Sequence, residues 1–242
     1  MKKIVLLLVL SLTIFSCSKV RKGEFLITGN AKGLADGIMV VVKKQNEFGL
    51  VVGVDSAKVK AGKFEIKGKV NEPSMHALFI KGLQQPIPFI LETGEIEVKV
   101  DKDSIWKSEI GGTNNNEEFQ KFNVKLNGFQ KKLVDFQNKN IQKLMDAQKK
   151  NDNATVEKLK KQYSDIQKGM DDYMAVYPEQ NSDSYISLLL IQNMFNSPKF
   201  DLAKVTKTYS NLDSDLKATK IGKEIGLKLK TIQNTQNAQK KK

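Results

Sequence analysis

The sequence predicts an α+β protein: an N-terminal antiparallel β-sandwich or barrel-like domain, followed by an all-helical region with a long antiparallel helical hairpin. Most glycines lie before residue 113, and short runs of alternating apolar and charged residues fill residues 24–110. Beyond residue 113, the spacing of apolar residues changes from two to three and four. A chain of 242 residues suits one ordinary domain or two small ones.

The first 16 residues form a predicted signal peptide. Lys2 and Lys3 precede an apolar run over residues 4–15, which is too short to cross a bilayer but suits a secretory signal. The run IFSC at residues 14–17 resembles the lipobox of bacterial lipoproteins. This resemblance implies that Cys17 carries a lipid anchor and that residues 17–23 form a tether. The alternative is an ordinary cleaved signal in which the single cysteine falls here by chance.

The β-rich domain is predicted over residues 24–110. Strand-like runs are expected at residues 25–28, 38–42, 50–54, 57–59, 64–67, 75–80, 89–91 and 96–100. Turn residues at 60–63 and 92–95 predict two hairpins, one joining 57–59 to 64–67 and one joining 89–91 to 96–100. Apolar residues alternate with charged ones in several of these runs, which indicates one buried face and one solvated face.

The helical region is predicted over residues 113–233. Two apolar stripes at helical spacing, from Phe119 to Leu144 and from Val156 to Tyr173, predict the hairpin, with a polar loop at 149–153 between them. Thr113 or one of the three following asparagines is expected to cap the first helix. Residues 184–195 predict a buried helix, and 201–212 and 214–232 predict two amphipathic ones. We expect residues 234–242 to form a polar, lysine-rich, frayed tail.

The composition excludes several classes of function. The single histidine and single cysteine exclude a zinc cluster, a redox pair and a disulfide. We find no catalytic constellation, so we expect neither enzymatic activity nor a metal or cofactor. The net charge is +13, but Arg21 is the only arginine and the lysines are dispersed. Since guanine and phosphate recognition favours arginine, we expect no nucleic acid partner.

A few residues invite a functional interpretation. Trp106, the only tryptophan, could stack on a sugar ring, but we expect a packing anchor between the two regions. His76 is expected to have a structural or surface role. The carboxylate pairs at residues 92 and 95 and at 101 and 103 flank turns, which is their expected role. The stripe of phenylalanines from Phe119 to Phe136 is expected to be core, with a partner-binding groove as the alternative.

Several short runs resemble a known family. These are VDSA at 54–57, GKFEIKG at 62–68, PFILETG at 88–94 and IGGTNN at 110–115, with looser likeness at 184–189 and 220–225. They are similar to the uncharacterised β-rich domain (domain of unknown function 4369) of Bacteroidetes-type envelope lipoproteins. In that family the domain usually precedes a thioredoxin-like domain of the TlpA or ResA type. No cysteine follows Cys17 in this sequence, so the chain as printed lacks the thiol pair that such a domain uses.

These observations favour a lipid-anchored envelope protein that acts as a non-catalytic binding or scaffold module. One alternative is the N-terminal part of a thiol-disulfide oxidoreductase without its thioredoxin domain, and another is a glycan-binding accessory lipoprotein. The expected partners are the membrane, through the anchor, and an envelope protein or a glycan. We place the protein in the bacterial cell envelope, on the outer membrane facing the periplasm, with the inner membrane as the alternative. The sequence leaves the oligomeric state open.

Overall fold

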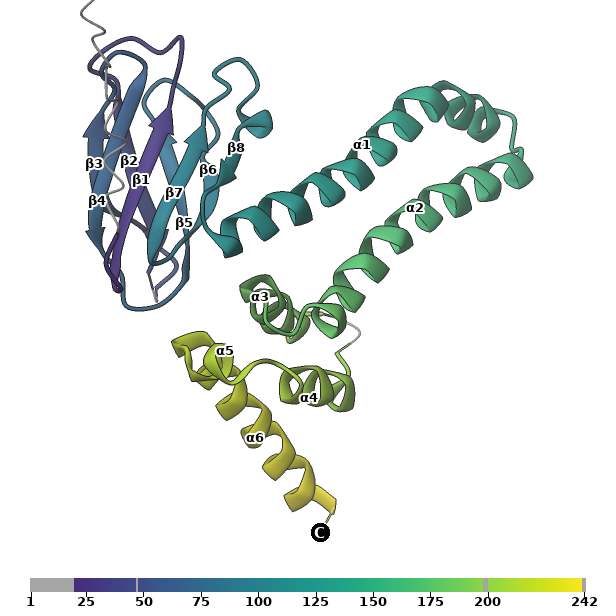
Figure 1. Cartoon of the computed structure of the whole chain (residues 1–242). Coiled ribbons are helices and arrows are strands. Elements are labelled where there is room, and N and C mark those ends of the chain that lie inside the picture. The colour runs from purple at the N-terminus through teal and green to yellow at the C-terminus, as the bar shows by residue number, and fades with distance from the viewer. Residues whose placement is uncertain (1–19, 47, 198–199, 241–242) are drawn as a thin grey trace, which may run out of the picture.

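The computed structural model describes residues 20–46, 48–197 and 200–240, and it has the predicted α+β layout (Figure 1). The strands are Glu24–Asn30 (β1), Met39–Gln45 (β2), Val51–Lys58 (β3), Lys63–Lys69 (β4), Ser74–Ile80 (β5), Ile87–Leu91 (β6), Gly94–Lys99 (β7) and Glu109–Gly111 (β8). A short 3₁₀ helix, Ile105–Lys107 (η1), precedes β8. The α-helices are Asn114–Lys149 (α1), Asn153–Gln180 (α2), Tyr185–Met194 (α3), Leu202–Ser210 (α4), Ser214–Ala218 (α5) and Lys220–Lys240 (α6).

The strands form two four-stranded sheets that pack face to face. One sheet has the order β4-β1-β7-β8 and the other β3-β2-β5-β6. Neighbouring strands are antiparallel except β1 and β7, which run parallel with Ile27 opposite Ile96. Inward-facing side chains such as Ile27, Val40 and Leu78 are fully buried between the sheets, while the charged partners along β4 and β7 face solvent. The alternation in the sequence therefore describes these strands correctly.

Both predicted hairpins are wrong, because each connection carries the chain from one sheet to the other. The strand β3 pairs with β2, and β4 pairs with β1 in the opposite sheet. Likewise, β6 pairs with β5, whereas β7 pairs with β1 and β8. Ala61 and Gly62 adopt φ of 50° and 69° in the first connection, and Gly94 adopts φ of 128° in the second. The turns therefore lie where the sequence predicts them, but the pairing of the strands is set by long-range packing.

Two glycines in the β1–β4 pair have a packing role. Phe25 lies opposite Gly68, and Gly29 lies opposite Phe64. A Cβ added to Gly29 would lie 2.0 Å from the Phe64 ring, and one added to Gly68 would lie 2.7 Å from the Phe25 ring. Each phenylalanine thus lies across a strand position that has no side chain, which closes the core at both ends of the pair.

A second apolar core forms among the C-terminal helices. Its centre is the face of α3 that carries Tyr185, Leu188 and Ile191, all fully buried. The predicted buried helix is confirmed, and its N-cap is Ser184, whose hydroxyl accepts from the Ile186 N–H. The predicted 214–232 helix is two helices, α5 and α6, separated at Thr219. The last helix continues to Lys240, past the point at which we expected a frayed tail.

The β-sandwich and the helical region are joined at β6. Ile90 points away from the sandwich interior and belongs to the helical core, with Met75 packed beside it. The Asn116 side chain, fully buried in the first turn of α1, bonds the backbone of Ile90 twice: its Oδ1 accepts from the Ile90 N–H (2.8 Å) and its Nδ2 donates to the Ile90 carbonyl (2.7 Å). One amide therefore acts as a strand partner for the edge of β6. We call this contact the joint.

Further hydrogen bonds surround the joint. The Asn115 amide donates to Glu92 (2.5 Å), and its oxygen accepts from the Tyr185 N–H (3.3 Å). The Glu72 carboxylate accepts from the N–H of Lys220 at the start of α6 (2.8 Å). The helical region is thus held to the sandwich at the start of α1 and of α6, and Asn115 links the start of α3 to α1. Thr113 is the N-cap residue of α1, but its hydroxyl accepts from Asn116 rather than capping a backbone N–H.

The joint predicts a large effect of a single amide. Asn116→Ala leaves the N–H and carbonyl of buried Ile90 without partners, which costs about 3 kcal/mol of unfolding free energy. The measurement is urea unfolding followed by circular dichroism. Asn114→Ala, at an exposed neighbour in the same turn, is the matched control and changes the free energy by less than about 0.5 kcal/mol. Equal losses in the two variants would show that the joint does not stabilise the fold.

Candidate functional site

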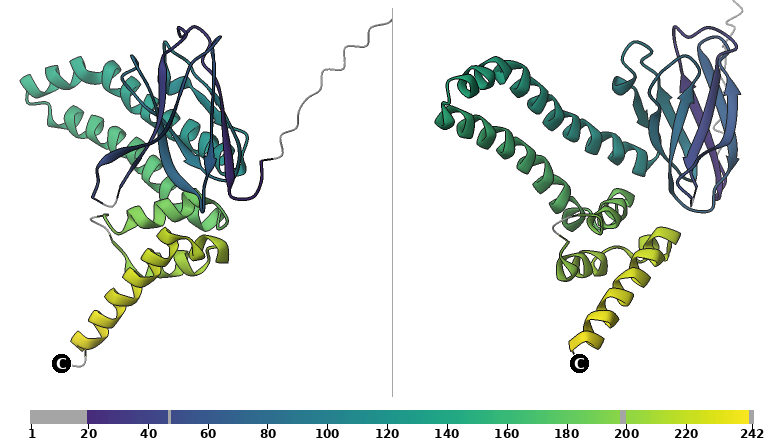
Figure 2. Two further views of the ribbon diagram at one scale, coloured as in Figure 1. Left: turned by 90° about the vertical axis from the view of Figure 1, so that its left-hand side faces the viewer. Right: turned by 180° about the vertical axis from the view of Figure 1, so that it is seen from behind.

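The helices α1 and α2 form a hairpin that projects from the rest of the molecule (Figures 1 and 2). We call residues 131–168 the arm. Its turn is built locally: Asn151 adopts the left-handed region (φ 53°), and Asp152 caps α2 by accepting from the Thr155 N–H (3.0 Å). The Thr155 hydroxyl also donates to Asp152, and these hydrogen bonds lower the pKa of that carboxyl. The sequence therefore defines where α1 ends and α2 begins.

The two helices are packed tightly only where they meet the body. There, Phe122 stacks on Tyr173 (5.4 Å between ring centres, 24°) and meets Tyr177 edge-on (4.9 Å). Burial raises the pKa of both tyrosines, so they stay neutral and serve as packing groups. Gly169 on α2 lets Phe129 on α1 come close, since a Cβ at that glycine would lie 3.2 Å from the ring. This cluster fixes the direction in which the arm leaves the body.

Farther out, the arm buries little of its apolar stripe. Ala147 and Leu159 are its buried residues, whereas Phe136, Leu144 and Tyr163 are only partly covered. Two amphipathic helices that pack only on each other leave the flanks of their apolar stripes in water, and such helices gain most of their stability from a packed apolar face. The arm is therefore a two-helix layer without a third element over it.

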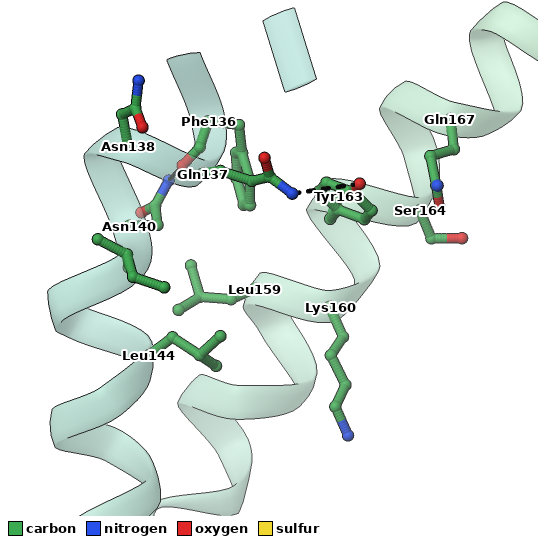
Figure 3. A pocket seen from close by; sticks show the side chains of 11 residues that line it. Phe136, Gln137, Asn138, Asn140, Leu144, Leu159, Lys160, Tyr163, Ser164 and Gln167 are labelled. Carbon is green, nitrogen blue, oxygen red and sulfur yellow. Dashed lines mark hydrogen bonds between the residues drawn. The ribbon is translucent and has the colours of Figure 1, made fainter. Parts of the chain in front are cut away.

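A groove of about 600 Å³ lies between the helices of the arm (Figure 3). Its apolar lining comes from both helices, with Phe136, Ile141 and Leu144 on α1 and Leu159 and Tyr163 on α2. The Ile141 side chain is 55% exposed, which is unusual for a large aliphatic residue inside a groove. At one end of the groove the Gln137 amide donates to the Tyr163 hydroxyl (3.4 Å). The groove thus has an apolar floor and a polar end.

The arm carries an excess of positive charge. Its acidic residues are Asp135, Asp146, Asp152, Glu157 and Asp165, and its lysines are Lys131, Lys132, Lys139, Lys143, Lys149, Lys150, Lys158, Lys160, Lys161 and Lys168. Three of these lysines form ion pairs along their own helix, to Asp135, Glu157 and Asp172. The other lysines are exposed, so the groove lies in a positive field.

Trp106 does not have the packing role that we predicted. It lies in η1, where no residue is buried, and its side chain is 66% exposed. The Lys107 ammonium lies 5.2 Å from the centre of its ring. The sandwich and the helices are joined instead by Ile90 and Asn116, which leaves the indole open to solvent. The packing role was predicted because tryptophan side chains are highly buried on average.

Comparison with known families identifies the β-rich part of the chain. Residues 25–119 match the family model described as Domain of unknown function (DUF4369). The family predicted from the strand motifs is therefore confirmed. The matched segment begins at the second residue of β1 and ends inside the first turns of α1, so it contains β2 to β8 and also Asn116 of the joint. No curated protein and no solved structure matches the chain.

The carboxylates of the DUF4369 segment take structural positions. Asp101 accepts from the N–H groups of Asp103 (3.1 Å) and Ser104 (2.8 Å), which closes the turn before η1. Glu92 accepts from Asn115 at the joint, while Glu95 is exposed on β7. Cys17, the predicted lipid-attachment residue, lies outside the described residues.

The described residues hold neither a cluster of metal-binding side chains nor a helix that could cross a membrane. Among residues 20–46, 48–197 and 200–240, no group of three or more histidine, cysteine, aspartate or glutamate side chains could hold a metal ion. Within the same residues, no helix is both long enough and apolar enough to cross a bilayer. The candidate binding sites are therefore the groove of the arm and the cleft beside Trp106.

His76 of the DUF4369 segment is a core residue. Its ring is buried inside the sandwich, 6.0 Å from the Phe89 ring centre, and its Nδ1–H donates to the Ser74 carbonyl (3.0 Å). Burial, helped by the nearby Lys44, holds the pKa of His76 below its ordinary value of 6.5, although the bond to Ser74 opposes this shift. The structural role expected from the sequence agrees with this position.

The buried imidazole predicts an acid-sensitive component of stability. Because the unfolded chain binds a proton at His76 more tightly than the folded one, this component is fully present above about pH 6.5 and is lost as the pH falls toward the folded-state pKa. His76→Gln removes it, so the loss of unfolding free energy between pH 7.5 and pH 5.5 becomes smaller than in the parent protein. Urea unfolding at both pH values measures the difference. Parallel pH profiles for the two proteins would contradict the assignment.

Proposed function

We propose that this protein is a lipid-anchored component of the bacterial cell envelope that acts as a non-catalytic binding module, and that its arm holds a helical segment of a partner protein. The observation that carries this proposal is the groove of the arm, where Ile141 is exposed to solvent and Phe136, Leu144 and Tyr163 are only partly buried. An amphipathic helix laid between α1 and α2 would cover Ile141 and Leu144 and complete a three-helix layer. Helix-in-groove recognition uses this arrangement.

The charge of the arm supports an acidic partner. Lysine outnumbers acidic residues two to one there, and Lys160 lines the groove itself. A partner helix with aspartate or glutamate beside its apolar stripe would gain from this field. A second copy of the arm would instead bring lysines against lysines, which disfavours self-association.

The anchor is proposed from the lipobox-like run that ends at Cys17. Lipidation there would place the sandwich a few residues from the bilayer, on the periplasmic face of the outer membrane, with residues 17–23 as the tether. Several acyl chains on one residue give stable anchoring where one chain does not. The joint would then hold the arm in one orientation relative to the anchored domain.

The non-catalytic assignment follows from how the reactive side chains are used. His76 is buried against Phe89, and Asp101 closes a turn. General acid–base chemistry needs such groups within reach of a substrate, in a cleft. The sequence supplies no second histidine or cysteine for any other constellation.

The anchor predicts the effect of one substitution at the predicted attachment site. In the native host, Cys17→Ser abolishes incorporation of an alkyne-labelled fatty acid and moves the protein from the membrane fraction to the soluble fraction, because the thioether that carries the lipid cannot form. Gel fluorescence after click labelling and membrane fractionation measure both effects. Ser18→Ala, one residue further on, is the control and keeps the label. Membrane attachment that survives Cys17→Ser would contradict the lipid anchor.

The arm predicts position-specific crosslinking in intact cells. A benzophenone amino acid at Ile141 yields one discrete adduct with an acidic protein. When the crosslinking is repeated in isolated membranes, the yield of this adduct falls at about 1 M salt, because the salt screens the charge attraction. The control is the same probe at Leu227, an equally apolar and exposed helical position on α6 away from the groove.

Three results would contradict the proposed partner. The same adduct from both positions would show non-specific contact. An adduct at twice the mass of the chain would show that a second copy fills the groove. An adduct whose yield does not change with salt would show that charge attraction does not contribute to binding of the partner.

A further inference from the structure

A cleft of about 870 Å³ lies at the foot of the arm, on the other side of the joint from the C-terminal helices. Its walls are the strand β6 with the residues before it, the η1–β8 segment, and the first half of α1. The side chains that matter here are Gln85, Trp106, Asn123, Val124 and Asn127. Trp106 and Val124 are 66% and 60% exposed, so the cleft presents apolar surface to solvent.

Side-chain amides dominate the polar lining. The side-chain amides of Gln85, Asn123 and Asn127 make no hydrogen bond within the part of the chain that the structure describes. Each amide can donate two hydrogen bonds and accept two. The cleft therefore offers many uncommitted donors and acceptors next to one large aromatic ring.

The charged residues at the rim are already paired. Glu109 binds Lys99 (2.9 Å), and Lys131 binds Asp135 (2.6 Å). The third charged residue of the lining, Lys107, has no ion-pair partner among the described residues, and its ammonium lies over the Trp106 ring. The side chains without any partner are neutral amides, which favours a neutral ligand over a phosphate or a carboxylate.

The strand edges beside the cleft are closed to an added peptide strand. Pro86, just before β6, and Pro88 within it have no N–H, and the N–H and carbonyl of Ile90 are taken by Asn116. On β8, the Ile110 N–H is bound by Gln120 (3.3 Å). An extended peptide gains most of its affinity from such edges, so a peptide strand is disfavoured here.

We propose that this cleft binds a neutral oligosaccharide. The flat apolar face of a pyranose ring stacks on the Trp106 indole, and the sugar hydroxyls bond the amides of Asn123, Asn127 and Gln85. A hydroxyl is both donor and acceptor, as an amide is, so this pairing needs no charge on either side. The proposal concerns a ligand and a site separate from those of the arm groove.

Gly128 allows the cleft to be filled without disturbing the fold. It lies in α1 at the cleft, and a Cβ added there has no heavy atom within 4 Å. Replacing a glycine inside a helix also removes its entropic cost. Gly128→Phe is therefore expected to fold, with its ring in the space that the sugar would use, and circular dichroism verifies the fold.

The test is a titration of the full-length protein in detergent with two neutral hexasaccharides, cellohexaose and chitohexaose. Because Trp106 is the only tryptophan, its emission reports the cleft directly. We expect a saturable blue shift with at least one of the two sugars. Gly128→Phe and the double variant Asn123→Ala with Asn127→Ala each weaken binding by about tenfold or more. Gln130→Ala, an exposed amide on α1 outside the cleft, leaves it within about twofold.

Several outcomes overturn the proposal. One is that neither sugar shifts the emission. Another is that the shift persists unchanged in Gly128→Phe. A third is that a proline-rich decapeptide binds the same cleft while both sugars fail, which would make this a peptide site. Crosslinking from Ile141 is unaffected by Gly128→Phe, so the two sites can fail independently.

Discussion

The two hydrogen bonds between the Asn116 amide and the backbone of Ile90 set the arrangement of the whole molecule. An edge strand normally bonds another strand along its free side, and here one side chain from a helix takes that place. The contact requires β6 to turn Ile90 outward, and the outward Ile90 then becomes part of the helical core. The orientation of α1, and with it the arm and the amide-lined cleft, depends on this buried amide together with the Asn115–Glu92 and Gln120–Ile110 hydrogen bonds.

The local features of the fold were predictable because they depend on spacing along the chain. Alternation placed Phe64 and Ile66 inside the sandwich and Glu65 and Lys67 outside it. The part of the stripe that carries Phe122, Phe129 and Phe136 packs on α2 as its spacing requires, and residues 184–195 form the buried helix. The strand motifs also led to the correct family.

What the sequence did not reveal depends on contacts between distant segments. Turn residues at 60–63 do not state whether the next strand returns to the same sheet, so β4 was paired with the wrong strand. Helical periodicity shows which side chains face a neighbouring helix, but it does not show that Ile141 stays exposed and that Leu144 and Tyr163 are only partly buried. Trp106 was misplaced because the joint forms elsewhere. The run of asparagines at 114–116 was the available signal for the joint, since three amides at a helix start exceed what capping needs.

The length of α1 has a mechanical consequence. Thirty-six residues at 1.5 Å each make a rod of about 54 Å, held near one end by the joint. Such a rod is a lever: a rotation of about 10° at Asn116 moves the far tip by about 9 Å, nearly the diameter of a helix. Small adjustments where the sandwich meets α1 would thus sweep the tip through a wide arc. The stiffness of the contacts at the start of α1 therefore sets how far the tip can move.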